Sequence, residues 1–81
     1  MNPRVEKVFP NDDYTLTIHF TNGEIKKYDV KPLLNNGVFL KIKDPFVFKQ
    51  AHVQLGSVGW PGEIDVCPDT LYENGTSLED I

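Results

Sequence analysis

The clearest hydrophobic pattern in the chain runs through residues 14–20. Apolar side chains alternate there with polar ones, and the apolar set is Tyr14, Leu16, Ile18 and Phe20. Because successive side chains of a strand point to opposite faces, this alternation predicts a strand with one buried face. Asn22-Gly23 follows directly, and both residues tolerate the positive φ of a type I′ turn. The chain is therefore expected to return through residues 24–30 as a hairpin.

A short apolar opening over residues 5–9 precedes this hairpin and ends at residues 10–13, Pro-Asn-Asp-Asp. Proline fixes φ, and Asn and Asp side chains favour turns, so a first strand followed by a turn is predicted. Together with the hairpin this makes a three-stranded antiparallel meander. In the third strand Ile25 is out of phase with Tyr28, which a bulge near Lys26-Lys27 would reconcile.

The middle of the chain predicts short helices. Pro32 suits the first turn of a helix over residues 31–34, and Asn-Asn-Gly follows as a stop signal. Residues 38–43 fit a short strand or a helical segment equally well, because short apolar runs do not discriminate. Asp44-Pro45 has the pattern of an N-cap before a first-turn proline, so one helical turn is predicted after it. Its candidate packing residues are Phe46, Val47 and Phe48.

The second half of the chain predicts another hairpin. Residues 51–55 alternate between apolar and polar side chains, Gly56-Ser57 permits a turn, and residues 58–60 offer the return strand. Pro61-Gly62 marks a further turn, and residues 64–66 have the composition of a short strand.

Residues 68–72 predict a last short helix, with an acidic residue in its first turn and Asn74-Gly75 as its stop. The predicted fold class is therefore α+β. Residues 1–75 form one small domain, with an antiparallel β-sheet (an N-terminal three-stranded meander plus a second short hairpin) and two or three short helices. Residues 76–81 have little to bury and are expected to form a flexible C-terminal tail.

The length and the net charge of the chain limit the functions that it can have. A chain of 81 residues supports one small core, since it hides only about 60–65% of its unfolded surface. Eight Lys and Arg against twelve Asp and Glu give a net charge of −4. That charge repels a phosphate backbone, so direct binding to nucleic acid is not expected. No stretch approaches the roughly 20 apolar residues of a membrane helix, so a cytoplasmic protein without a membrane anchor is expected.

Cys67 is the single cysteine of the chain. It excludes an intramolecular disulfide, cannot alone form a zinc site, and fits a reducing compartment. A nucleophilic Cys67 would need His19 or His52 beside it, and the sequence shows no complete catalytic set. Beside Pro68, a cysteine more often packs as a small apolar side chain. We therefore expect no enzymatic activity and no cofactor, and an enzyme using Cys67 is the remote alternative.

Trp60-Pro61 begins the most distinctive segment. Tryptophan is common in binding hot spots and in small cores, and a core position is favoured here. Glu63, Asp65 and Asp69 could hold a hard cation, but their spacing fits no EF-hand loop, so no metal site is predicted. Asp65 is expected instead to cap N–H groups of the last helix. The candidate interaction residues are Trp60, Pro61, Asp65, Asp69 and Tyr72.

Several segments, taken in order, resemble one family. They are the alternating strand of residues 14–20, Asn22-Gly23-Glu24, Tyr28-Asp29-Val30-Lys31-Pro32-Leu33-Leu34, Val58-Gly59-Trp60-Pro61, Ile64-Asp65-Val66 and Pro68-Asp69-Thr70-Leu71-Tyr72. Over nearly its whole length the chain thus resembles the bacterial domain of unknown function 2442 family. The resemblance implies a small α+β fold and supplies no catalytic residues. It also implies a gene that lies beside genes for other small proteins, in arrangements suggestive of toxin–antitoxin pairs.

The leading hypothesis is a non-catalytic protein-interaction or accessory module, and the resemblance suggests the antitoxin-like member of a small bacterial gene pair. The acidity of the chain would suit a basic protein partner, whose identity the sequence does not give. The chain itself is expected to be a monomer or a weak homodimer. The alternative is a transcription-regulatory domain that acts with a DNA-binding partner, since this chain has no basic recognition helix of its own.

Overall fold

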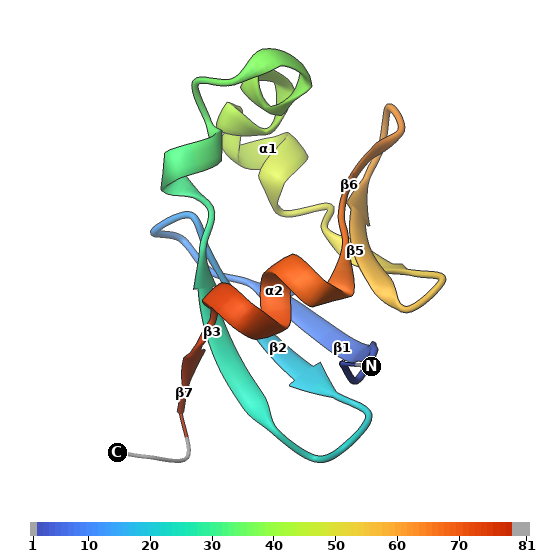
Figure 1. Cartoon of the computed structure of the whole chain (residues 1–81). Coiled ribbons are helices and arrows are strands. Elements are labelled where there is room, and N and C mark those ends of the chain that lie inside the picture. Colours follow the sequence, from blue (N-terminus) through green and yellow to red (C-terminus); the bar gives the residue numbers. More distant parts are fainter. Residues whose placement is uncertain (1, 79–81) are drawn as a thin grey trace.

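The computed structural model describes residues 2–78, which form two antiparallel sheets joined by short helices (Figure 1). The N-terminal meander is confirmed, and a fourth short strand extends it beyond the third. The first sheet has the order β1-β2-β3-β7, with β1 (Val5–Pro10), β2 (Thr15–Phe20), β3 (Ile25–Asp29) and β7 (Thr76–Ser77).

Strand β2 carries the buried face that its alternation predicts. Leu16, Ile18 and Phe20 are fully buried. Tyr14 lies just before the strand at a φ of 63°, and its hydroxyl donates a hydrogen bond to the main-chain oxygen of Lys43. Tyr14 therefore links the meander to the helical part of the chain instead of continuing the strand.

The predicted bulge near Lys26-Lys27 is wrong. Strands β2 and β3 pair without interruption, and the irregularity of this sheet lies in β1, between Val5 and Lys7. Ile25 needs no bulge because it pairs with His19, and its carbonyl oxygen accepts a hydrogen bond from the Leu78 N–H at 3.0 Å.

The hairpin turn between β2 and β3 is also longer than predicted. The Phe20 N–H donates to the Glu24 carbonyl at 2.9 Å, which leaves a three-residue loop instead of a two-residue type I′ turn. Gly23 takes the positive φ, at 91°. The side chain of Asn22 accepts from the Glu24 N–H at 3.0 Å, so it closes the turn through a side-chain hydrogen bond.

The second sheet confirms the second hairpin. Its turn is Leu55-Gly56 and not Gly56-Ser57, and one further strand follows. The strands are β4 (His52–Gln54), β5 (Ser57–Trp60) and β6 (Ile64–Val66), and β5 is the central one. All four residues of β5 are buried. The two sheets meet at β1 and β4, where the Val5 N–H donates to the Gly56 carbonyl at 2.9 Å.

Four short helices connect these strands. They are the 3-10 helices η1 (Lys31–Leu33) and η2 (Gly37–Lys43) and the α-helices α1 (Pro45–Phe48) and α2 (Pro68–Asn74). The open assignment of residues 38–43 is thus settled as helical. Asp44 caps α1 as predicted, accepting a hydrogen bond from the Phe46 N–H at 2.9 Å. The prediction that Phe46 packs inward is wrong, because its side chain is 83% exposed while Phe48 is buried.

Helix α2 packs against the meander, and the rings of Phe20 and Tyr72 meet edge to face with centroids 5.2 Å apart. After α2 the chain pairs with β3, Thr76 opposite Lys27 and Ser77 opposite Lys26. The predicted tail over residues 76–81 is therefore wrong at its start, and its residues 79–81 lie outside the described residues. None of the helices within residues 2–78 has the length and apolar character needed to cross a membrane.

Candidate functional site

The predicted interaction residues differ in exposure, and Trp60 is buried. Trp60 is 1% exposed, and its indole nitrogen donates a hydrogen bond to the Phe48 carbonyl at 3.0 Å. The favoured core position is thus confirmed, and Trp60 is not available for docking. Pro61, Asp65 and Asp69 are exposed, in the β5–β6 turn, on β6 and on α2 respectively.

The prediction that Asp65 caps the last helix is wrong. The N-cap of α2 is Cys67, and no side-chain hydrogen bond caps it. Asp65 instead lies opposite Gly59 in the second sheet and faces solvent between two buried neighbours, Ile64 and Val66. The alternation of side chains along β6 therefore points the Asp65 carboxylate to solvent.

Tyr72 is half-buried against the meander. The ammonium of Lys26 lies 3.9 Å from its ring centroid and donates to its main-chain oxygen at 2.7 Å. A hydrogen bond between the Glu24 and Tyr72 side chains raises the pKa of Tyr72 and lowers the pKa of Glu24. These contacts fix α2 on the sheet, which is a structural role.

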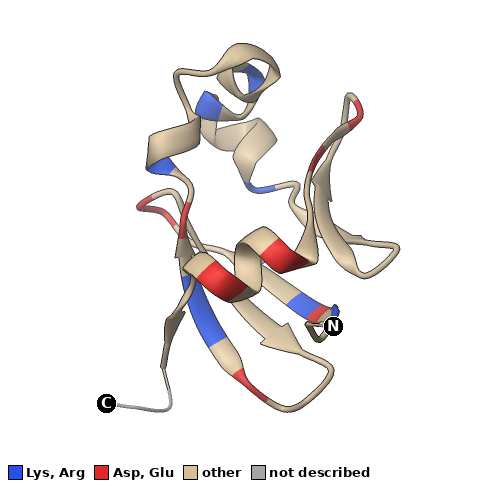
Figure 2. Cartoon of the chain, in the orientation of Figure 1, with Lys and Arg blue, Asp and Glu red and all other residues tan. Residues whose placement is uncertain are grey.

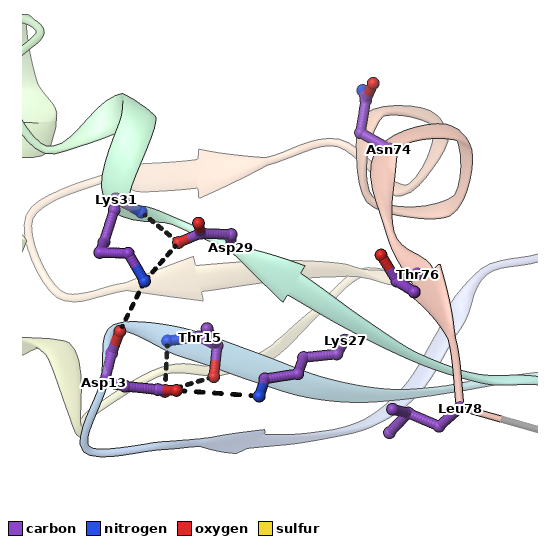
Figure 3. Close-up of a pocket in the computed structure, with 8 residues that line it drawn as sticks. All are labelled: Asp13, Thr15, Lys27, Asp29, Lys31, Asn74, Thr76 and Leu78. Carbon is purple, nitrogen blue, oxygen red and sulfur yellow. Dashed lines mark hydrogen bonds and ion pairs between the residues drawn. The ribbon is translucent and has the colours of Figure 1, made fainter. Parts of the chain in front are cut away.

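A pocket of about 380 Å³ opens beside this helix, between β3, β7 and the turn before β2 (Figure 3). Its lining carries two carboxylates and two ammonium groups, and each ammonium pairs with a carboxylate. The Lys31 Nζ lies 3.3 Å from the Asp29 Oδ1, and the Lys27 Nζ lies 3.7 Å from the Asp13 Oδ2. The lining residues are Asp13, Thr15, Lys27, Asp29, Lys31, Asn74, Thr76 and Leu78.

Asp13 organises this pocket. Its Oδ1 accepts a hydrogen bond from the Thr15 hydroxyl at 2.5 Å, and Thr15 is buried. This hydrogen bond, helped by the nearby charge of Lys27, lowers the pKa of Asp13. Because the charges of the lining pair with one another, the pocket attracts neither anions nor cations strongly. Among residues 2–78 no group of three or more His, Cys, Asp or Glu is placed to hold a metal ion.

Cys67 is exposed at the start of α2. Its sulfur lies 3.1 Å from the Thr70 hydroxyl, and this hydrogen bond is the main cause that lowers the pKa of the thiol. His52 contacts the main-chain oxygen of Gln50, and the His19 ring packs against Phe9. The structure thus places Cys67 against a hydroxyl and not in a hydrogen-bonded pair with either histidine.

Three exposed apolar side chains lie within one short segment of the chain. The segment of η2 and α1, residues 37–48, is here called the helical lobe. Val38 and Leu40 are more than half exposed, and Phe46 projects almost fully into solvent. Lys41 and Lys43 lie in the last turn of η2. Figure 2 shows basic positions in blue on the helical segment at the top of the molecule.

The sequence of η2 and α1 does not show by itself which of their apolar side chains are buried. A 3-10 helix has three residues per turn, so the buried Ile42 and the half-buried Phe39 share one face of η2. Val38 and Leu40 flank that face. Helix α1 has four residues, so it buries Phe48 and leaves Phe46 outside.

Comparison with known proteins gives one match. The family model described as "Protein of unknown function (DUF2442)" matches residues 5–77 of the chain. No curated protein and no solved structure matches the chain.

Proposed function

The chain belongs to this family of proteins of unknown function, so the family gives no activity to assign to it. We propose, from the residues of the chain itself, that it is a non-catalytic protein-interaction module. Its docking surface is the helical lobe. The observation that carries the proposal is the exposure of Phe46, 83%, on a one-turn helix that Phe48 anchors in the core.

Exposure of a large aromatic side chain has a cost in solubility that a surface contact offsets. Single exposed apolar residues are ordinary, but here three of them, Val38, Leu40 and Phe46, occur on two helices that lie side by side (Figure 1). Aromatic side chains with apolar neighbours are typical of the centre of a protein interface.

The lobe is held rigidly, which favours its use as a binding surface. The Asp44 cap fixes the start of α1, and Phe48 packs against the rings of Tyr14 and Trp60. Tyr14 also donates a hydrogen bond to the main-chain oxygen of Lys43 at the end of η2. A preorganised surface loses little conformational entropy when a partner binds.

The charge of the lobe supports one kind of partner. The lobe holds two lysines, Lys41 and Lys43, and one carboxylate, Asp44, which caps α1. Neither lysine makes a side-chain ion pair within the described residues, so the lobe is net basic in a chain whose net charge is −4. The complementary partner is a protein segment with apolar side chains flanked by Asp or Glu. The proposed partner is therefore acidic at the contact, whereas the net charge of the whole chain suggests a basic partner. An antitoxin-like role in a small gene pair is one biological form of such a module.

The test is site-specific cross-linking of the full chain. Benzoylphenylalanine replaces Phe46, the tagged protein is irradiated in a lysate of its native cells, and the cross-linked peptide is sequenced. The expected result is one protein, joined through an apolar segment that is rich in acidic residues.

Phe9 is the matched control, because it is an exposed phenylalanine on β1, outside the lobe. The same replacement at Phe9 should give no adduct with that protein. Equal adducts at both positions, or no protein adduct at position 46, would contradict the proposal. An adduct with DNA at position 46 would favour the regulatory class instead.

A further inference from the structure

The turn between β4 and β5 carries a leucine where the backbone favours other residues. Leu55 and Gly56 have φ values of 50° and 82°, so both central positions of this two-residue hairpin loop are left-handed. Such loops favour Asn-Gly, because branched and bulky side chains fit the left-handed region poorly. A leucine at the first position is locally unfavourable.

Burial does not compensate for this strain. The Leu55 side chain is 91% exposed, the highest exposure among the large apolar residues of the described chain. A residue that breaks both the local backbone preference and the preference for burial is explained when it makes a contact outside the chain.

Arg4 is built into the same turn. Its guanidinium donates a hydrogen bond from Nη1 to the Leu55 carbonyl at 3.0 Å. A Cβ atom at Gly56 would come within 2.7 Å of that same nitrogen, so the arginine lies directly on the glycine. The N-terminal segment and the hairpin turn therefore form one surface.

That surface continues onto helix α2. A hollow of about 330 Å³ is lined by Asn2, Arg4, Pro68 and Asp69. Asn2 closes one side of it with a hydrogen bond to Glu73 at 2.8 Å. The surface thus carries an exposed apolar side chain, a concave site and charges of both signs: Arg4 and Asp69 line the hollow, and Glu73 lies at its edge, where Asn2 holds it. Within residues 2–78 neither Arg4 nor Asp69 has an ion-pair partner.

These charges indicate which partner fits. A partner that carries one sign of charge would pair with either Arg4 or Asp69. It would leave the other side chain desolvated without a counter-charge. A second copy turned by two-fold symmetry presents the opposite sign to each, because residue i then meets residue j and residue j meets residue i.

We propose that a second copy of this chain docks on the surface formed by Leu55, Arg4 and Asp69, as a two-fold dimer in which Arg4 of each copy pairs with Asp69 of the other. Leu55 of each copy packs into the contact between them. This inference is independent of the proposed function, because the turn between β4 and β5 lies apart from the helical lobe (Figure 1). The contact is small, so the dimer is weak.

The test is sedimentation of the full chain over a concentration series up to about 1 mM, a range in which weak contacts of this size are measured. The wild-type protein should approach the dimer mass. Arg4→Glu and Asp69→Lys should each weaken dimerisation at least tenfold, because each homodimer then contains two like-charge pairs. An equimolar mixture of the two variants should restore the dimer, since both cross-copy pairs are again opposite in sign.

Restoration in the mixture depends on contact between copies, so a merely structural role for either residue cannot produce it. Leu55→Asn should also weaken dimerisation at least tenfold while the fold is retained. Two controls are matched: Glu63→Asn relieves a positive φ of 64° in the other hairpin, and Asp65→Lys reverses an exposed charge outside the surface. Both should dimerise as the wild type does. A monomeric wild type at the highest concentration, or a mixture no tighter than its components, would overturn the proposal.

Discussion

The indole nitrogen of Trp60 donates a hydrogen bond to the main-chain oxygen of Phe48 at 3.0 Å, and the two rings lie with centroids 6.1 Å apart. This contact joins the second sheet to α1. It is buried, and it fixes the helix that presents Phe46 to solvent.

Replacing Trp60 by Phe keeps an aromatic ring but removes the donor. The Phe48 oxygen is then buried without its partner, and the smaller ring leaves a void. We expect a loss of about 2–3 kcal/mol in unfolding free energy, measured by urea denaturation. Phe46→Gln is the matched comparison and should change it by less than about 0.5 kcal/mol. Equal effects of the two variants would mean that one burial assignment is wrong.

Leu55→Asn should make the monomer more stable. Asparagine tolerates the left-handed φ of 50° that leucine occupies with strain, and no buried contact is lost. The expected gain is about 1 kcal/mol, read as a rise in melting temperature at low protein concentration. A fall in melting temperature would show that the leucine stabilises the turn itself, which removes the reason for an external contact.

The hydrogen bond between Thr15 and Asp13 makes the unfolding free energy depend on pH. The pKa of Asp13 is below its ordinary value of 3.8 in the folded protein. The stabilisation is therefore complete above the unfolded pKa and is lost as the pH falls through the folded pKa. The difference in unfolding free energy between wild type and Asp13→Asn should shrink as the pH is lowered from about 5 to 2.

The same interaction can be followed directly by NMR titration of the Asp13 carboxyl. Thr15→Val removes the hydroxyl donor and should raise the pKa of Asp13, since that hydrogen bond is the largest cause of the shift. An unchanged titration in Thr15→Val would assign the shift to Lys27 and to the backbone N–H of Thr15, which the variant retains.

Cys67 tests the remote enzymatic alternative. The hydrogen bond with Thr70 lowers the pKa of the thiol below its ordinary value of 9.0, so alkylation should reach its half-maximal rate below that pH. Thr70→Val should move the midpoint upward. A midpoint that Thr70→Val leaves in place would point to another activating group near the sulfur and would revive the catalytic hypothesis.

Local sequence chemistry was sufficient for much of the fold. The alternation through Leu16, Ile18 and Phe20 predicted β2 because a two-residue period has no other regular structure. Asp44-Pro45 predicted the start of α1 because capping is decided by neighbouring residues. Burial of Trp60 followed from the scarcity of large side chains in a small core.

The remaining features depend on contacts between distant segments. Strand β7 exists because α2 delivers Thr76 beside Lys27, which no local pattern encodes. The outward Phe46 could not be distinguished from the inward Phe48, since a single helical turn has no periodicity to read. The strain at Leu55 was hidden because the glycine that follows it suited either of two turn registers. The candidate docking surfaces lie where these tertiary effects decide the structure.

Binding of a partner protein by the helical lobe is tested most sharply by titration calorimetry with the partner that cross-linking identifies, purified without the cross-link. Its dissociation constant is measured for wild type, Phe46→Gln and Phe9→Gln. We expect at least a tenfold weaker complex for Phe46→Gln, a factor equal to about 1.4 kcal/mol, and an unchanged complex for Phe9→Gln. Wild-type affinity in Phe46→Gln, with the fold intact, would show that the lobe is not the docking surface.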